Sequence, residues 1–330
     1  MKKVFITQQT MDEVVSHIAD SGFAVEYRDN PQAMSPQELA GAVADCSGVL
    51  TLLTDRIDAS LLESSRDLEV VANCAVGFDN VDIAAATAAG VMVTNTPDVL
   101  TDATADLAMA LMLGAARRLV EGDAYMRQGR YTHFRMRQEQ IGYDISGAAL
   151  GIVGFGRIGK AVARRAHFGF GMTVRYYDVI RHLSEAEEAA LGVAYVSFYK
   201  LLETSDYVSI HTPLTPETRH LFNVATLHKM KPTAILVNTA RGQIIDEHAL
   251  VDALRSGTIG GAGLDVYENE PQMVAGLGAL TQRMVLLPHL GSATEATRRK
   301  MALKAADNLV LALRGQRPPN LVNREVAKRG

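Results

Sequence analysis

Cysteine and long runs of one charge are scarce in this sequence. Its 330 residues include only two cysteines, Cys46 and Cys74, and neither belongs to a CxxC pair. We therefore expect no disulfide framework and no metal site. The net charge is −4 and the basic clusters are short, so the chain lacks the electrostatic footprint of a protein that binds nucleic acid.

Long apolar stretches are missing as well. No segment approaches the roughly 20 apolar residues that a membrane-spanning helix needs. The amino terminus, MKKVFITQQT, has two lysines but too short an apolar run for a signal peptide. We therefore expect no membrane association and a reducing, cytoplasmic setting. The composition, 48% hydrophobic and 21% charged, is that of a globular protein, and the length favours two domains.

The first hundred residues alternate short apolar runs with helical patterns. Runs such as KVFIT and GVLTLL read as strands, and MDEVVSHIAD and SPQELAGAVAD read as helices. Ser35 and Glu38 form a predicted capping box at the start of the second helix. Strands that alternate with helices predict a parallel sheet covered on both faces, which is the α/β class.

The pattern changes at residue 101. TDATADLAMALMLGAARRLVEGD reads as one long helix, apolar on more than one face and therefore expected to be buried between domains or subunits. Residues 125–147 are polar and irregular and read as a connector or an arm. A second strand–helix series begins at Ala148, and a long helix closes the chain at 294–315. From the pattern alone, that last helix could belong to either series.

A glycine pattern opens the second series. Gly154-Phe155-Gly156-Arg157-Ile158-Gly159 follows the apolar run LGIV and precedes a helical pattern, which is the context of a dinucleotide-binding turn. In such a turn the first glycine permits the bend, the second lets the main chain approach a pyrophosphate, and the third allows close helix packing. The helix amino end then faces the anion.

An acidic residue is expected roughly 20 residues after this turn, where it binds the adenosine ribose. TVRYYDVIRH supplies Asp178, whose carboxylate favours NAD(H) and repels the 2′-phosphate of NADP(H). Arg181 lies three residues further on, and a guanidinium there could bind that phosphate. We interpret it as a surface arginine. The prediction is a preference for NAD(H), with NADP(H) possible.

Three later strands end in candidate catalytic residues. They are Arg241 in VNTARGQIIDEHAL, Glu268 and Glu270 in GLDVYENEP, and His289 in LLPHLGSAT. Ligands of open α/β sheets bind beyond the carboxyl ends of strands. A guanidinium binds a carboxylate, a histidine gives and retakes a proton near neutral pH, and a carboxylate orients the ring. Together these groups would suffice for hydride transfer to a 2-keto acid. Each of these residues alone could instead have a purely structural role.

Six segments carry a family resemblance that covers nearly the whole chain. They are NCAVGFDNVD (73–82), VTNTPDVLTDATADLAMALML (93–113), LGIVGFGRIGKAVARRAHFGFGM (150–172), VNTARGQIIDEHAL (237–250), GAGLDVYENEP (261–271) and PHLGSATEATR (288–298). The chain resembles the D-isomer-specific 2-hydroxyacid dehydrogenases, and most of all their glyoxylate/hydroxypyruvate reductase and 2-ketogluconate reductase branch. The resemblance implies two Rossmann-like or flavodoxin-like domains, each a parallel sheet flanked by helices, with a cleft between them.

The resemblance also implies domain bounds and partners. A discontinuous substrate-binding domain would comprise residues 1–99 and 292–330, because the last helix returns to it. An NAD-binding domain would comprise residues 100–291. A homodimer is implied, built around the helix that begins at Thr101, and the substrate would be a small 2-keto acid.

Roles for single residues follow from the same resemblance. Arg241 would bind the carboxylate and keto oxygen, His289 would be the general acid/base, and Glu270 rather than Glu268 would be its partner. The main chain of Ala75, Val76 and Gly77 would bind the substrate carboxylate. The cofactor would be lined by Thr104, Gly154, Phe155, Gly156, Arg157, Ile158, Gly159, Asp178, His211, Pro213, Thr218, Thr239, Ala240, Arg241, Asp265, His289 and Gly291.

Some positions depart from the family pattern. Relatives that use NADPH tend to have a neutral residue near position 178 followed by arginines, whereas this chain has Asp178-Val179-Ile180-Arg181. The arm usually carries tryptophan near position 131, where this chain has Tyr131, and it has no tryptophan at all. Whether the arm enters a partner's active site, which 2-keto acid is used and which direction runs in the cell are left open.

Other functions are less well supported by the residues. Phosphite dehydrogenases of this family have lysine at the position of Val76, and formate dehydrogenases have glutamine where this chain has Glu270. The main alternative within the family is a 2-ketogluconate reductase or another D-2-hydroxyacid dehydrogenase. From a different class, NAD-binding corepressors use the same fold as a scaffold, and function must be argued from the site rather than the fold.

Overall fold

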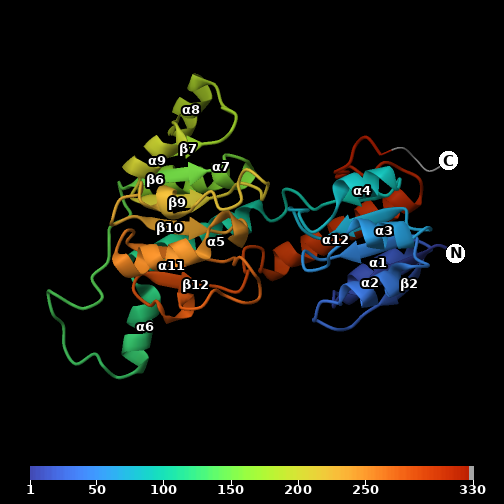
Figure 1. Cartoon of the computed structure of the whole chain (residues 1–330), viewed down its shortest axis with the longest axis horizontal. Helices are drawn as coiled ribbons and strands as arrows, with labels where there is room; N and C mark the ends of the chain where they lie inside the picture. The colour runs from blue at the N-terminus through green and yellow to red at the C-terminus, as the bar shows by residue number, and fades with distance from the viewer. Residues whose placement is uncertain (327–330) are drawn as a thin grey trace. The chain divides into compact units, whose positions relative to one another are not determined.

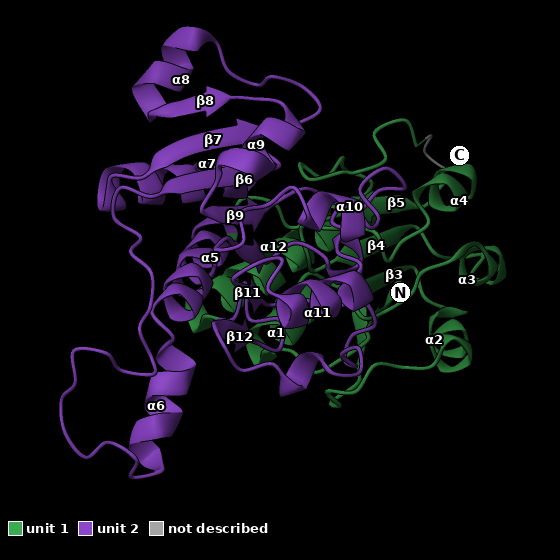
Figure 2. Cartoon of the chain, turned by 60° about the vertical axis from the view of Figure 1, so that its left-hand side comes forward, with its two compact units in different colours: residues 1–100, 294–330 green, residues 101–293 purple. Residues whose placement is uncertain are grey.

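The computed structural model describes residues 1–326, and the chain divides into two compact units (Figures 1 and 2). Unit 1 comprises residues 1–100 and 294–330, and unit 2 comprises residues 101–293. Each unit is built on one parallel sheet, so the predicted α/β class with two sheet domains is confirmed.

Unit 1 has a five-stranded parallel sheet in the order β2-β1-β3-β4-β5. Its strands are β1 (Lys3–Ile6), β2 (Ala24–Tyr27), β3 (Gly48–Thr51), β4 (Val70–Asn73) and β5 (Met92–Thr94). Its helices are α1 (Asp12–Asp20), α2 (Pro36–Val43), α3 (Ala59–Ser64), α4 (Ile83–Ala88) and α12 (Glu295–Leu313). This is the flavodoxin-like order, in which the chain changes direction across the sheet between β1 and β3.

Helices cover both faces of this sheet. The last helix, α12, packs on β3, β4 and β5 and on α1, while α2, α3 and α4 pack side by side in sequence order. The strands β3 and β4 are buried along their whole length, as expected for a parallel sheet between two helical layers. The predicted capping box of α2 is confirmed, because the Glu38 amide donates to Ser35 Oγ and the Ser35 amide donates to the Glu38 carboxylate.

Unit 2 has a seven-stranded parallel sheet in the order β12-β11-β10-β9-β6-β7-β8. Its strands are β6 (Ala149–Val153), β7 (Thr173–Tyr177), β8 (Val193–Tyr195), β9 (Tyr207–Ile210), β10 (Ile235–Asn238), β11 (Gly261–Leu264) and β12 (Met284–Leu286). Its α-helices are α5 (Thr101–Ala116), α6 (Leu119–Arg127), α7 (Arg157–Arg164), α8 (Glu185–Leu191), α9 (Phe198–Thr204), α10 (Val224–Leu227) and α11 (Glu247–Ser256). The order is that of a dinucleotide-binding fold, with its switch point between β6 and β9.

The single helix expected from residue 101 is interrupted, so that expectation was wrong. Arg118 has a left-handed main chain, with φ of 54°, between α5 and α6. The returning arm explains the break, because the Tyr143 amide donates to Ala116 O at 2.9 Å and takes a carbonyl that a continuous helix would use. Beyond the break, α6 and the arm project from the body of unit 2 (Figures 1 and 2).

Candidate active site

The turn between β6 and α7 depends on glycine at two positions. Gly154 has φ of +91°, and a Cβ on it would lie 2.5 Å from His211 C and Thr212 N. A Cβ on Gly159 would lie 2.2 Å from Gly154 O. The turn therefore packs against the end of β9 on one side and against its own helix on the other, which only glycine permits.

The start of α7 is open toward an anion. Gly156 is the N-cap and supplies no side-chain hydrogen bond to the first helical turn. A Cβ built on Gly156 would meet no atom within 4 Å, so the approach to the Arg157 and Ile158 main chain is clear. Main-chain amides at a helix amino end bind phosphate, and this turn fits the pyrophosphate of a dinucleotide.

Asp178 stands directly after β7 and contacts this turn. Its Oδ2 accepts a hydrogen bond from the Phe155 amide at 2.7 Å, and its Oδ1 accepts one from the Val179 amide at 2.7 Å. The Phe155 ring is fully buried and stacks on Tyr176, with ring centroids 3.8 Å apart. The Phe155 side chain therefore faces the core rather than a ligand, and the Asp178 carboxylate lies at the position expected for ribose recognition.

The loop after β9 is braced by its own side chains. Thr218 Oγ1 donates to Pro213 O at 2.7 Å and accepts from the Thr215 amide at 2.7 Å. His211 Nε2 lies 2.8 Å from Ser209 Oγ. Burial lowers the pKa of His211 to about 3, which favours the neutral ring at physiological pH.

The loop after β10 holds a buried hydroxyl that lacks a partner. Thr239 Oγ1 is buried and makes no hydrogen bond within residues 1–326. Its neighbour Ala240 donates its amide to Asn238 Oδ1 at 3.0 Å, which tightens the turn. Buried polar atoms are nearly always paired in folded proteins, so an orphaned hydroxyl at a strand end fits a site that a polar ligand completes.

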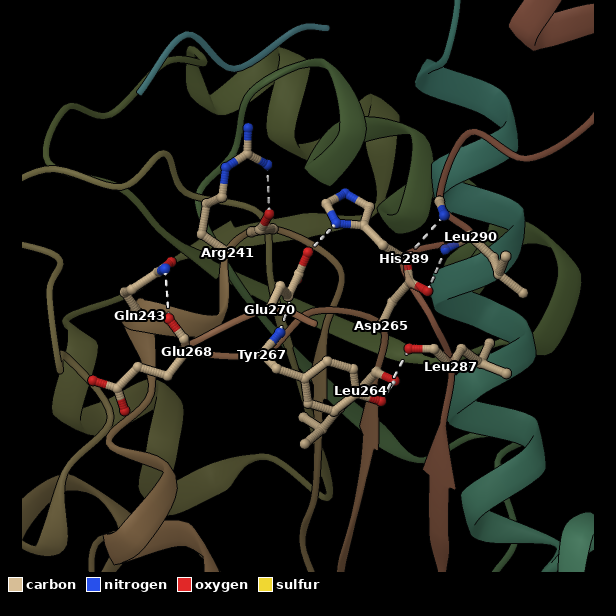
Figure 3. Close-up of polar contacts among 12 residues, drawn as sticks. Arg241, Gln243, Leu264, Asp265, Tyr267, Glu268, Glu270, Leu287, His289 and Leu290 are labelled. Atoms are coloured by element: carbon tan, nitrogen blue, oxygen red, sulfur yellow. Dashed lines mark hydrogen bonds and ion pairs between the residues drawn. The ribbon is translucent and has the colours of Figure 1, made fainter. Parts of the chain in front are cut away.

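His289 and Glu270 form an ion pair at the carboxyl ends of β12 and β11 (Figure 3). His289 Nδ1 lies 2.8 Å from Glu270 Oε2, and the other oxygen, Oε1, accepts from the Tyr267 amide at 2.9 Å. Burial alone would raise the pKa of Glu270, but the hydrogen bond and charge of His289 bring the pKa below its usual value. The pair therefore fixes the ring through Nδ1 and leaves Nε2 for another partner.

Asp265 holds the loop that carries His289. Its buried carboxylate accepts from the Leu290 amide at 2.6 Å and from the Gly291 amide at 2.8 Å, and its carbonyl accepts from the His289 amide at 2.9 Å. Thr104 Oγ1 donates to Gly291 O at 3.1 Å. His289 has φ of 56°, a conformation that costs about 1–2 kcal/mol, and these bonds stabilise it.

Arg241 lies on the neighbouring loop. Asn238 Nδ2 donates to Arg241 O at 2.9 Å, which shapes the turn after β10. A Cβ on Gly242 would lie 1.9 Å from Tyr267 C, so the main chains of the two loops are in direct contact. Figure 3 shows the Arg241 and His289 side chains extending toward the same side, with the Glu270 carboxylate reaching the imidazole ring.

Glu268 is engaged elsewhere. Its Oε1 lies 2.6 Å from His220 Nε2, and its amide donates to Glu247 Oε1 at 2.9 Å. The structure therefore brings Glu270, and not Glu268, to His289. The sequence reasoning missed His220, and no local signal identifies it, because only the fold places it beside Glu268.

Comparison with known proteins identifies the family. The family model described as "D-isomer specific 2-hydroxyacid dehydrogenase, NAD binding domain" matches residues 109–291. A glyoxylate reductase from Korarchaeum cryptofilum is 48% identical over 326 residues, which cover 99% of this chain and 97% of that protein. This chain belongs to the D-isomer specific 2-hydroxyacid dehydrogenase family.

Solved structures of similar proteins agree with this assignment. The TT0316 protein from Thermus thermophilus has a TM-score of 0.89 and 42% identity, covering 97% of this chain and 99% of that one. An NADPH-dependent glyoxylate/hydroxypyruvate reductase from Sinorhizobium meliloti, solved with NADP and malonate, has a TM-score of 0.85 and 32% identity, covering 100% and 99%. The present dehydrogenase is thus an oxidoreductase with an NAD binding domain.

In unit 1 of this dehydrogenase, asparagine side chains shape the loop after β4. Asn73 Nδ2 donates to Gly77 O at 2.9 Å, and Asn95 Nδ2 donates to Val76 O at 2.8 Å. The Ala75 amide donates to Asn73 O at 2.9 Å. The hydrogen bonds of the described chain leave the Val76 and Gly77 amides for a ligand, while the Ala75 amide is already engaged.

The same end of the unit 1 sheet is hollow. A cavity of about 220 Å³ opens beyond the carboxyl ends of β1 and β3, and Cys74, directly before the loop, lines it. Such a switch point is where open α/β sheets bind ligands.

Among residues 1–326, no cluster of three or more His, Cys, Asp or Glu is arranged to hold a metal ion, and no helix is long and apolar enough to span a bilayer.

Proposed function

We propose that this dehydrogenase reduces a small 2-keto acid, with glyoxylate or hydroxypyruvate as the first candidates, to the D-2-hydroxy acid at the expense of NADH. The observation that carries this proposal is the ion pair of His289 and Glu270 beside Arg241, in the unit that holds the glycine turn. The relatives from Korarchaeum cryptofilum and Sinorhizobium meliloti, a glyoxylate reductase and a glyoxylate/hydroxypyruvate reductase, support this substrate class.

The chain's own residues supply binding and proton transfer. Arg241 binds the carboxylate and keto oxygen of the substrate through a planar guanidinium. A bound reduced nicotinamide would supply a hydride to C2. His289 donates a proton from Nε2 to the oxygen that gains negative charge, and Glu270 holds the ring and stabilises its protonated form.

Recognition of the cofactor is assigned to unit 2. The α7 amino end would hold the pyrophosphate, and Asp178 would accept hydrogen bonds from the ribose hydroxyls. A carboxylate at this position disfavours a 2′-phosphate by like-charge repulsion. The proposal is therefore a preference for NADH, with slower use of NADPH.

A panel of substrates and cofactors tests the function. Glyoxylate, hydroxypyruvate, pyruvate and 2-ketogluconate are each assayed over a range of concentrations with NADH and with NADPH. We expect the highest kcat/KM with glyoxylate or hydroxypyruvate. For that acid, kcat/KM with NADH should exceed kcat/KM with NADPH by about tenfold or more, a difference of about 1.4 kcal/mol. Equal or faster turnover with NADPH would refute the cofactor preference.

The same panel separates the alternatives. Fastest turnover of 2-ketogluconate would favour the ketogluconate reductase function. Tight nucleotide binding with no turnover of any acid would favour a corepressor-like scaffold.

A homodimer is proposed for the native protein. Apolar side chains are exposed on α6 and the arm, which is unusual for a solvated surface. They are Leu119, Val120, Met126, Phe134, Met136 and Ile141, with Met136 85% exposed. Light scattering after size exclusion should give a dimer, and the double variant Phe134→Asp with Met136→Asp should shift the population toward monomer. A wild-type monomer at micromolar concentration would contradict the proposal.

A further inference from the structure

Arg181 forms a bidentate ion pair with Glu188 of α8. Arg181 Nε lies 2.8 Å from Glu188 Oε1, and Nη2 lies 2.8 Å from Oε2. The same Oε1 accepts from the Tyr176 hydroxyl at 2.7 Å. Tyr176 is fully buried in β7 and stacks on Phe155 of the glycine turn, so this ion pair is anchored to the core of unit 2.

The loop between Asp178 and α8 folds back on itself. His182 Nε2 lies 3.2 Å from Asp178 Oδ2, so the ring of the residue directly after Arg181 contacts the Asp178 carboxylate. In a dinucleotide fold, the 2′ position of the adenosine ribose lies beside this acid. A guanidinium that turned toward that position would bind a 2′-phosphate through two hydrogen bonds.

We propose that Glu188 determines cofactor specificity by holding the Arg181 guanidinium away from a 2′-phosphate, in addition to the repulsion by Asp178. The inference rests on the dinucleotide site proposed above and extends it to a residue that touches no cofactor. Glu188 is thus a positioning residue, which acts through Arg181.

The environment of Glu188 strengthens its ion pair with Arg181. Its side chain is only 9% exposed, whereas Arg181 is 41% exposed. The Arg181 guanidinium beside it keeps the pKa of Glu188 below its usual value, so the carboxylate is charged at neutral pH. Paired, charge-assisted hydrogen bonds to a poorly solvated carboxylate are among the stronger polar contacts, and a phosphate must compete with them for the same guanidinium.

The test replaces Glu188 by glutamine. Glutamine keeps the shape of the side chain and can still accept a hydrogen bond from the Tyr176 hydroxyl, but it loses the negative charge. Binding of 2′,5′-ADP and of 5′-AMP is measured by calorimetry, because these fragments report the 2′-phosphate without catalysis. We expect the affinity ratio of 2′,5′-ADP to 5′-AMP to rise about three- to tenfold in Glu188→Gln. The gain should disappear in the double variant Glu188→Gln with Arg181→Met.

Glu185→Gln is the matched control on the same helix. Glu185 Oε1 lies 3.8 Å from Arg181 Nη1, and its side chain is 90% exposed, so its removal should leave the ratio unchanged. Arg181→Met alone should also leave the ratio unchanged, because the guanidinium is already held. This single variant keeps the proposal testable if Glu188→Gln fails to fold.

The possible outcomes distinguish a failure of the proposed role of Glu188 from a failure of the proposed dinucleotide site. An unchanged ratio in a folded Glu188→Gln variant that still binds 5′-AMP would overturn the role of Glu188. A loss of 2′,5′-ADP affinity in Arg181→Met alone would overturn it too, since Arg181 would then already reach the phosphate. Failure of the wild-type protein to bind either nucleotide or NADH would overturn the dinucleotide site itself.

Discussion

Replacement of His289 by alanine should lower kcat for keto acid reduction by about two to four orders of magnitude, the loss expected when a general acid is removed. The reason is geometric. Nδ1 of His289 is bonded to Glu270 at 2.8 Å, so Nε2 is the nitrogen left to protonate the substrate oxygen. Steady-state kinetics with saturating NADH and acid would measure the effect.

Cofactor binding and a second histidine provide the controls. The proposed pyrophosphate and ribose contacts lie on the β6–α7 turn and at Asp178, so the Kd for NADH should change less than about threefold in His289→Ala. His220 is also paired with a glutamate, Glu268, at 2.6 Å, and His220→Gln should cost less than about tenfold in kcat. A His289→Ala enzyme with near-normal turnover would remove the assignment of His289 as proton donor.

The parallel sheets were predictable because their strands are short apolar runs. Strands such as β4 and β9 are buried at every position, and the sequence indicates this with short, mostly apolar runs between helical patterns. The interruption after Ala116 was not predictable, because the apolar pattern continues through it. It depends on Tyr143, which takes the Ala116 carbonyl from far along the chain.

The candidate site was likewise predictable only in part from the sequence. Its residue types and their positions after strands followed from the sequence, since strand ends of a parallel sheet share one edge. The partner of each side chain did not follow. Glu268 and Glu270 are two residues apart, and the path of the main chain turns one toward His220 and the other toward His289.

Arg181 was ambiguous in the sequence for a related reason. A cation three residues after Asp178 could serve a phosphate or an internal partner, and periodicity does not distinguish the two. The partner, Glu188, becomes apparent only when the loop folds α8 back onto β7. Similarly, the left-handed main chain of His289 depends on the carboxylate of Asp265, a contact between two separate strand ends.

Replacement of Glu270 by glutamine should lower kcat by about two orders of magnitude and also change the pH profile of reduction. Glutamine keeps the size of the side chain but loses the negative charge that stabilises the protonated imidazole. The pKa of Glu270 lies below its usual value, so the wild-type carboxylate stays charged from weakly acidic to alkaline pH. Reduction needs protonated His289, and the alkaline limb of kcat should therefore move to lower pH in Glu270→Gln.

Glu268→Gln is the matched control, two residues away and changed in the same manner. Glu268 contacts His220 and not His289, so its replacement should leave the alkaline limb in place and change kcat by less than about threefold. The two variants separate a charge acting on His289 from general damage to the loop, because loop damage would affect both. Equal losses in both variants, with no shift of either pH profile, would mean that Glu270 supports the fold rather than proton transfer.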